Sequence, residues 1–217
     1  MDFTWRLVVQ WGPQFLEGLK QTVIVFAIAT VFALITGTLV ALVGTLQSRV
    51  VRAICRVYIS IFRNSPLLVQ LFFIFYGLPF IGIRFSPVVC GVLAITLNEG
   101  AFVAEILRGT IQAIPRGDWE AGASLSLSRF QILRHIVLPQ AIRDAIPSLA
   151  GQASIILKDT SVLSLIMITE LTRVSGLLFN KTFDTTGYIV VAGMYIALFL
   201  IITQLSQLLE KKLRVLR

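Results

Sequence analysis

The sequence predicts an all-α membrane protein with five membrane-spanning helices and one helical hairpin outside the lipid. Hydrophobic residues make up 56% of the chain and charged residues only 14%, with a mean hydropathy of +0.86. Soluble globular domains carry about 25% charged residues, so this composition excludes that class. Five apolar runs are each long enough to cross a bilayer, which takes roughly 20 helical residues. The 217 residues leave no room for an additional soluble domain of ordinary size.

The chain begins with an amphipathic segment, residues 1–20, in which apolar and polar residues are interleaved. Its tryptophans favour the level of the lipid headgroups, so we expect this segment to lie on the membrane surface. The second span is interrupted by Pro66, which should kink the helix and free a backbone carbonyl. A polar loop, residues 169–187, is expected between the last two spans. The five expected spans are residues 22–46, 57–80, 87–107, 145–168 and 188–209.

The longest polar stretch, residues 115–139, separates the third span from the fourth and is too polar to lie in lipid. Apolar residues recur in it at helical spacing from Leu125 to Val137, which predicts one or two short amphipathic helices. Ser128, followed three residues later by Gln131, predicts a capping box at the start of the second helix. Such a hairpin could dock a partner or could simply connect two spans, and the pattern alone leaves both readings open.

The net charge of +8 is explained by membrane topology rather than by nucleic-acid binding, because the basic residues flank the apolar runs. Five spans place the two termini on opposite sides of the membrane. The larger basic set falls on the side of the hairpin, and cytoplasmic loops are enriched in Lys and Arg. We therefore expect the hairpin and the C-terminus in the cytoplasm and the N-terminus outside. The larger set is Arg49, Arg52, Arg56, Arg108, Arg116, Arg129, Arg134, Arg143, Lys211, Lys212, Arg214 and Arg217; the smaller set is Arg6, Lys20, Arg84, Arg173 and Lys181.

Two spans carry polar and charged residues near the expected middle of the membrane. Span three holds Asn98 and Glu99, and span four holds Lys158, Asp159 and Thr160. Ionisable groups in lipid are costly, so their presence points to a function. Glu99 and Lys158 fall at matched depth. They could form an ion pair that holds two helices together, or they could line a path for a zwitterion, and the sequence leaves both readings open.

Catalytic and metal-binding motifs are absent from the sequence. The segment 176–182 has a Lys-Thr pair but lacks the glycine that a phosphate-binding Walker A loop places before the lysine. The only histidine is His135, which argues against a metal site and against a Ser-His-Asp catalytic set. Cys55 and Cys90 are expected near opposite membrane faces, too far apart for a disulfide. We expect no enzyme activity in this chain, so the energy for active transport would enter from another chain.

The hairpin contains Glu120-Ala121-Gly122, then Ser126, and ends in Ile136-Val-Leu-Pro139. This pattern resembles the cytoplasmic EAA signature of the permease subunits of bacterial ATP-binding-cassette (ABC) importers. Further stretches resemble the polar amino-acid branch of that family, the histidine/glutamine type. These stretches occur in order along nearly the whole chain, at residues 63–79, 98–109, 134–143 and 157–164.

The resemblance implies a type I ABC importer permease fold, a single transmembrane domain over residues 1–217, and a place in the bacterial inner membrane. It implies a second permease subunit, identical or homologous, and an extracytoplasmic binding protein that delivers an amino acid. It also implies two cytoplasmic ATPase subunits that bind ATP and magnesium, so that this chain needs no cofactor of its own. The residues expected to contact the ATPase are Glu120, Ala121, Gly122, Leu125, Ser126 and Phe130.

The hairpin departs from the usual pattern of this family at three positions. Gly122 stands where alanine is usual, and a glycine costs up to about 1 kcal/mol in a helix interior. Ser126 stands where the turn usually has glycine, so it must adopt the backbone angles that glycine would adopt. Asp118 precedes Glu120 in place of a more usual Gln, and we expect it to cap the helix that presents Glu120.

A second class of function also fits the apolar runs and the charged spans. The chain could be a self-sufficient secondary transporter or a channel subunit, with Glu99 and Lys158 carrying a coupling ion. Secondary transporters often contain paired halves, and the sequence shows no repeat of fixed period. The importer reading is therefore preferred.

Overall fold

The computed structural model describes the backbone of residues 3–46 and 48–214, and all of its elements are helical. Four helical stretches are long and apolar enough to cross a membrane, and one bent helix pair can serve as a fifth span. These findings confirm the predicted fold class. The long elements are α2 (Gly12–Val43), α3 (Arg49–Asn64), α5 (Pro87–Ala113), α8 (Leu138–Asp159) and α10 (Thr186–Arg214).

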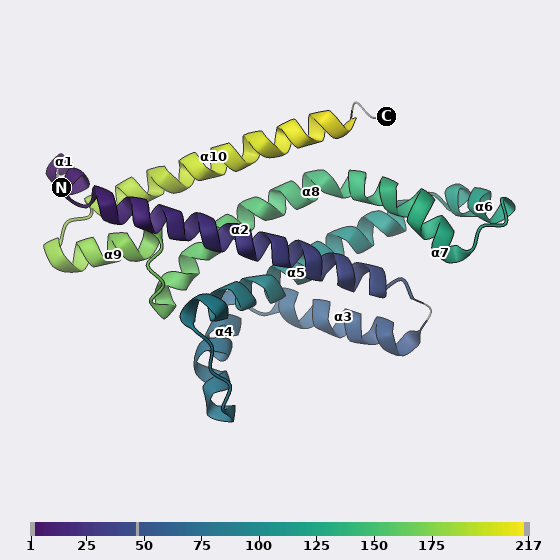
Figure 1. The fold of residues 1–217 in the computed structure, drawn as a ribbon, viewed down its shortest axis with the longest axis horizontal. Coiled ribbons are helices and arrows are strands. Elements are labelled where there is room, and N and C mark those ends of the chain that lie inside the picture. Colours follow the sequence, from purple (N-terminus) through teal and green to yellow (C-terminus); the bar gives the residue numbers. More distant parts are fainter. Residues whose placement is uncertain (1–2, 47, 215–217) are drawn as a thin grey trace.

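Shorter elements connect and extend these spans (Figure 1). The short α-helices are α1 (Trp5–Gln10), α4 (Leu67–Phe72), α6 (Arg116–Ser124), α7 (Arg129–Ile132) and α9 (Leu171–Thr182). The π-helical turns are η1 (Phe73–Gly77) and η3 (Leu133–Val137), and the 3₁₀ turns are η2 (Leu78–Ile81) and η4 (Thr160–Ile166).

The centre of the bundle is the packing of α2 against α5. Small residues recur every four positions along α2, at Ala29, Ala33, Gly37 and Ala41, and all four are buried. The backbones approach so closely that a Cβ atom on Gly37 would lie 2.5 Å from the Cβ atom of Val103. Lipid tails are as apolar as core side chains, so membrane helices associate through such close packing of small residues.

The N-terminal segment differs from the prediction. A separate short helix is limited to α1, and residues 12–21 instead form the first turns of α2. Pro13 lies in the first turn of α2, where a missing N–H is tolerated, and the helix then continues to Val43. The apolar residues of this segment pack in the protein, because Phe15 is buried in a cluster with Leu171 of α9. Residues 1 and 2 lie outside the described part of the chain.

The second span breaks where Pro66 predicts it, and α3 and the following helical stretch (Leu67–Ile81) meet at an angle of 105°. Pro66 has no N–H to offer the carbonyl of Phe62, four residues earlier. That carbonyl instead accepts hydrogen bonds from the Nδ2 of Asn98 at 2.9 Å and the Nε2 of Gln70 at 3.0 Å. The predicted kink and freed carbonyl are both confirmed, and side-chain amides satisfy the carbonyl as the lipid environment requires.

The predicted boundary at Pro139, between the hairpin and the fourth span, is wrong. α7, η3, α8 and η4 form one helical run from Arg129 to Ile166, so the second arm of the hairpin continues into the span. A single π-helical turn, η3, ends at Val137, two residues before Pro139. Such a turn shifts the hydrogen-bond register by one residue, which lets the helix pass a residue without an N–H.

The predicted polar loop at residues 169–187 contains the helix α9. Glu170 caps it by accepting hydrogen bonds from the backbone N–H groups of Thr172 at 2.8 Å and Arg173 at 2.7 Å. The hydroxyl of Tyr195 donates a third hydrogen bond to this carboxylate. Burial raises the pKa of Glu170, and these donors oppose the rise. The loop prediction failed because the helix is polar on its outer face.

The two ends of the molecule differ in structure. α6, α7 and the connection from α2 to α3 lie at one end of the long axis, with the last turns of α10 directed toward it, whereas α1 and α9 lie at the other end (Figure 1). The N-terminal and C-terminal ends therefore lie apart along the bundle, as an odd number of spans requires. The predicted basic residue Arg217 lies outside the described residues.

Candidate functional site

The hairpin, residues 115–139, consists of two helical arms that enclose an apolar seam. Ile132 and Val137 of the second arm are buried in one cluster with Ile111 and Ile114 from the end of the third span. This burial removes apolar surface from water, and it attaches the hairpin to the bundle. The hairpin is therefore an ordered element and not a slack connection.

Gly122 allows the two arms to pack closely. A Cβ atom on Gly122 would lie 2.8 Å from the Cγ1 atom of Ile132 and 3.0 Å from the Cδ1 atom of Ile136. Alanine would displace these side chains, so the helix tolerates the low helix propensity of glycine. Because Gly122 is buried, it is the one residue among the six expected ATPase contacts that does not face outward.

The turn after α6 is a Schellman motif centred on Ser126. Ser126 has a φ of 56°, in the left-handed region that favours glycine. The N–H of Leu127 donates to the carbonyl of Gly122 at 3.2 Å, and the N–H of Ser126 donates to the carbonyl of Ala123 at 2.9 Å. The expectation that Ser126 adopts angles typical of glycine is confirmed.

The caps of the two arms give one confirmed prediction and one wrong prediction. Ser128 and Gln131 form the predicted capping box, in which each side chain bonds the backbone N–H of the other residue. Asp118 does not cap α6, because the helix begins earlier, after Pro115. Asp118 lies in the first turn and accepts a hydrogen bond from the Nε2 of Gln140 at 3.0 Å, which ties the first arm to α8.

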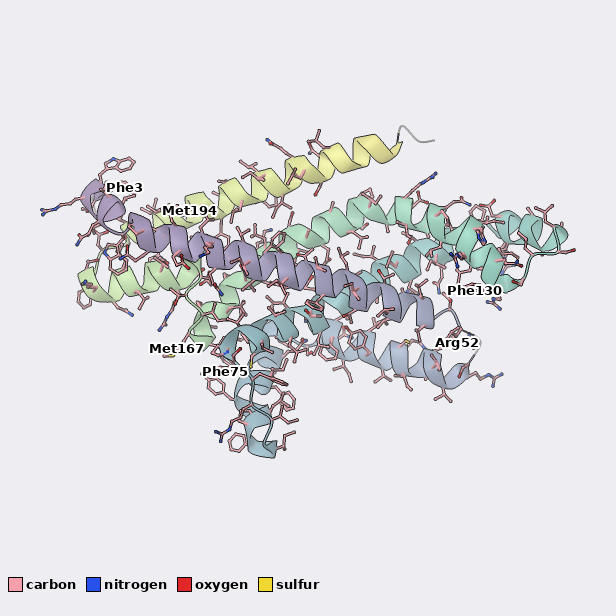
Figure 2. All side chains as sticks on the ribbon, viewed as in Figure 1. Phe3, Arg52, Phe75, Phe130, Met167 and Met194 are labelled. Carbon is pink, nitrogen blue, oxygen red and sulfur yellow. The ribbon has the colours of Figure 1, made fainter. Side chains whose placement is uncertain are left out.

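The outward face of the hairpin carries two large apolar side chains and one carboxylate. Leu125 is 72% exposed and Phe130 is 66% exposed, and Glu120 is also exposed. Figure 2 shows Phe130 at the hairpin end of the molecule. Large exposed apolar side chains with a charged neighbour are typical of a surface that binds another protein.

A second candidate site lies inside the bundle and consists of Glu99, Gln152 and Asp159, here called the carboxyl cluster. Glu99 is 1% exposed, and its carboxylate accepts a hydrogen bond from the Nε2 of Gln152. The side chain of Asp159 also lies within hydrogen-bonding reach of Glu99. Gln152 was not predicted, although it precedes Asp159 by seven residues, which is two helical turns and therefore the same face of α8.

The ion pair between Glu99 and Lys158, one of the two alternatives that the sequence leaves open, is not formed among the described residues. Lys158 is exposed, and its Nζ atom lies 5.3 Å from the ring centroid of Phe199 on α10. This cation–π contact directs Lys158 into a groove of about 560 Å³ between α8 and α10. Lys158 and Asp159 are adjacent and point about 100° apart, so only one of them can face Glu99.

The remaining two candidates in the spans bond to the backbone. Asn98 donates to the carbonyl of Phe62 at the helix break, and the hydroxyl of Thr160 donates to the carbonyl of Leu157 at 2.7 Å. Both side chains are buried. Their hydrogen bonds hold the ends of broken helical segments, so they position the spans around the carboxyl cluster.

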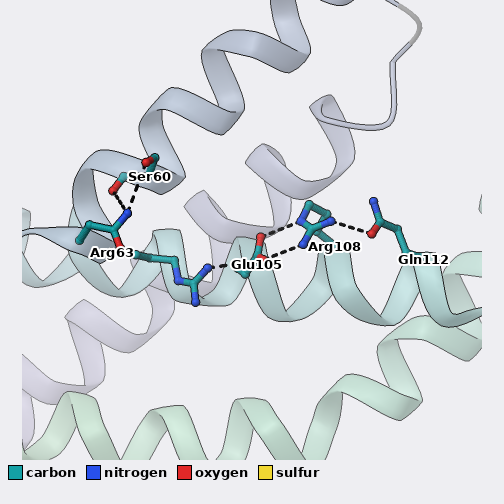
Figure 3. A network of polar contacts seen from close by, with 6 residues as sticks. Ser60, Arg63, Glu105, Arg108 and Gln112 are labelled. Carbon is teal, nitrogen blue, oxygen red and sulfur yellow. Dashed lines mark hydrogen bonds and ion pairs between the residues drawn. The ribbon is translucent and has the colours of Figure 1, made fainter.

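An ion-pair network joins the second and third spans (Figure 3). Arg108 binds Glu105, three residues earlier on α5, through two hydrogen bonds of 2.7 and 2.6 Å. Arg63 adds a contact of 3.5 Å to the same carboxylate, and Gln112 accepts a hydrogen bond from Arg108. The contact of Arg63 with Glu105 was not predicted, because the two residues are distant in sequence.

The chain matches the family described as binding-protein-dependent transport system inner membrane component over residues 29–215. It is 34% identical to the probable amino-acid ABC transporter permease protein YckA of Bacillus subtilis (strain 168), over 97% of this chain and 93% of that protein. It is 32% identical to the glutamine transport system permease protein GlnP of Escherichia coli (strain K12), over the full length of both.

Solved structures show the same fold. A chain from the crystal structure of an amino acid ABC transporter with histidines has a TM-score of 0.91 and 30% identity, covering 98% of this chain and 100% of that chain. A chain of the MetNI methionine ABC transporter, in an inward-facing conformation, has a TM-score of 0.80 and 16% identity, covering 94% of this chain. At that identity the second likeness concerns the fold alone.

Proposed function

The chain belongs to the family of binding-protein-dependent transport system inner membrane components, and we propose that it is the membrane-spanning permease subunit of an ATP-driven amino-acid importer. The relatives named as amino-acid and glutamine permeases support this substrate class. The observation that carries the proposal is the ordered hairpin, whose outward face is apolar and whose second arm continues into a span.

The hairpin acts as a lever. An ATPase that binds Leu125 and Phe130 and moves them displaces the helical run from Arg129 to Ile166. This run carries Gln152 and Asp159, so a movement at the ATPase reaches the carboxyl cluster. A partner shifts a conformational equilibrium of a protein only when it binds the two conformations with different affinity. The hairpin moves between the inward-open and outward-open forms, so the ATPase binds the two forms differently.

The partners follow from this arrangement. Two ATPase subunits dock on the hairpins of two permease subunits, identical or homologous, and ATP and magnesium bind on the ATPases. The hairpin faces the cytoplasm and the N-terminus faces outside, where a binding protein delivers the amino acid. The gathering of Arg49, Arg52, Arg116 and Arg129 at the hairpin end supports this orientation, because cytoplasmic segments are rich in arginine.

The substrate path passes between the carboxyl cluster and the groove that contains Lys158. A zwitterion needs an anion for its ammonium group and a cation for its carboxylate. Glu99 and Asp159 provide the first and Lys158 provides the second, and both lie on neighbouring parts of α5 and α8. Asn98 and Thr160 act indirectly, by holding the backbone that presents these groups.

The substitution Glu120→Lys tests the coupling role. It reverses the charge on the docking face, and like charges across an interface cost several kcal/mol, so we expect a loss of at least about tenfold in ATPase copurification and ATP-driven glutamine uptake. Glu17→Lys is the matched control, because Glu17 is an exposed carboxylate near the N-terminal end of α2, far from the hairpin.

Normal uptake in the Glu120→Lys variant would contradict the coupling role. The rival function, a secondary transporter, predicts that the chain reconstituted alone takes up glutamine along an ion gradient without any ATPase. That result would overturn the proposal as a whole.

A further inference from the structure

The hairpin end of the molecule contains a cleft of about 980 Å³ between α2, α3, α5 and the hairpin. Seven arginines line it, and Glu105 is the only carboxylate among the described residues that do so. We call this space the arginine cleft. Its arginines are Arg49, Arg52, Arg56, Arg63, Arg108, Arg116 and Arg129.

The helix α3 supplies four of these arginines from one of its faces. At about 100° per residue, Arg49, Arg52, Arg56 and Arg63 point in similar directions. The face about 140° further round the helix is apolar and exposed, and it consists of Val50, Ile54, Val57 and Ile61. An amphipathic helix of this kind can contact acyl chains with its apolar face and charged headgroups with its basic face.

The cleft has a neutralised deep part and a strongly basic shallow part. In the deep part, Glu105 binds Arg63 and Arg108 (Figure 3). In the shallow part, Arg49 and Arg56 of α3 and the hairpin residues Arg116 and Arg129 line the same cleft. Glu105 is the only carboxylate among the described lining residues.

Trp119 also lines the arginine cleft, and it is half-buried. Tryptophan is enriched at the level of the lipid headgroups. Its position, together with the ends of α2 and α5 nearby, indicates that the shallow part opens at the membrane surface.

We propose that the shallow part of the arginine cleft binds the phosphate headgroup of an anionic phospholipid from the leaflet on the hairpin side. Arginine pairs with phosphate through two parallel hydrogen bonds, and basic pockets between spans on the cytoplasmic side bind acidic headgroups. A lipid fits better than free phosphate, because Trp119 in the cleft lining favours the level of the headgroups and the exposed apolar face of α3 can contact acyl chains. The leaflet assignment rests on the orientation in the proposed function.

Topology alone explains why arginines occur on this side of the membrane, but it requires no convergence on one cleft. A bound headgroup would connect α3 to the hairpin by bridging Arg49 and Arg56 to Arg116 and Arg129. The lipid would thus hold together two elements that move in transport.

The test uses the full-length chain in non-ionic detergent, with thermal unfolding as the readout. Dioleoyl phosphatidylglycerol at about one hundred times its dissociation constant should raise the Tm by at least about 5 °C, because a ligand of the folded state stabilises it. Dioleoyl phosphatidylcholine at the same concentration should give a much smaller rise.

The variant Arg49→Gln/Arg56→Gln should bind phosphatidylglycerol at least about tenfold more weakly, since each basic residue near an acidic lipid contributes about 1 kcal/mol. The matched control Arg134→Gln/Arg143→Gln removes the same charge at the same end but outside the cleft, and it should bind as the wild type does. Arg49→Lys/Arg56→Lys keeps the charge and should retain most of the shift.

Equal binding by the Arg49→Gln/Arg56→Gln variant and its control would overturn the proposal. An equal rise in Tm from inorganic phosphate alone would overturn the lipid as occupant and assign the cleft to a free anion. These measurements need neither ATPase nor substrate. Their failure is therefore distinguishable from a failure of the transport proposal, which is tested by uptake.

Discussion

Gly122 and Ser126 occupy the two positions of the hairpin where an ordinary side chain or ordinary backbone angles would not fit. Gly122 lies against Ile132, and Ser126 has a φ of 56° in the Schellman turn. A left-handed conformation costs roughly 1–2 kcal/mol for a residue other than glycine. The turn accepts this cost because its hydrogen bonds fix the direction in which Leu125 and Phe130 are presented.

The helix α6 contains two glycines whose alanine variants allow a matched comparison of stability. Gly122→Ala should lower the stability by about 1–3 kcal/mol, because overpacking against the buried Ile132 outweighs the gain in helix propensity. Gly117→Ala should raise it by up to about 1 kcal/mol, because a Cβ atom there meets nothing within 4 Å. Thermal unfolding of the two purified variants measures the difference. Equal shifts in Tm would contradict the close packing of the two arms.

At the scale of elements, the break between α3 and α4 depends on the amide of Asn98. Asn98→Leu should destabilise the protein by about 1–2 kcal/mol, because the carbonyl of Phe62 then keeps only the bond from Gln70. Thr96→Val is the control. Thr96 lies on the same helix and is buried, and its hydroxyl has no hydrogen-bond partner, so its removal should be neutral or stabilising.

Thermal unfolding in detergent compares the two variants, and each kcal/mol of lost stability should lower the Tm by about 2–4 °C. A double variant, Asn98→Leu/Gln70→Leu, should lose more than the sum of the single losses, because it leaves the carbonyl without either amide donor. Additive losses would show that another group satisfies the carbonyl of Phe62.

Local signals predicted most of the elements. The apolar runs gave the five spans, Pro66 gave the break, and Ser128 with Gln131 gave the capping box. The helix α9 was missed because its polar outer face hides the buried stripe that includes Leu171 and Leu178. The run through Pro139 was missed because a π-helical turn leaves no clear mark in the sequence.

The candidate site was only partly predictable for a geometric reason. Sequence gives the depth of a residue along a span, and Glu99 and Lys158 indeed fall on neighbouring helices. It does not give the rotation of one helix about its axis relative to another. That rotation places Gln152 and Asp159 beside Glu99, and it directs Lys158 toward Phe199 instead.

At the scale of the whole molecule, the hairpin and α9 lie at opposite ends of the bundle, and arginines gather at the hairpin end (Figure 1). The arrangement has a consequence for coupling. A force applied to the hairpin acts along the axis of the continuous run that ends at Ile166, near the base of α9.

The proposed orientation predicts from which side of the membrane a reagent can reach each end of the bundle. A single cysteine at Leu125, which is 72% exposed, and one at Phe183, which is 81% exposed, should react with a membrane-impermeant maleimide from opposite sides. Both variants carry Cys55→Ser, while Cys90 is buried and protected. Leu125→Cys should be labelled in inside-out vesicles and Phe183→Cys in right-side-out vesicles, because the proposed orientation puts the arginine-rich end in the cytoplasm. The opposite pattern would place the hairpin outside the cell, beyond the reach of any ATPase, and the lever mechanism would fail with it.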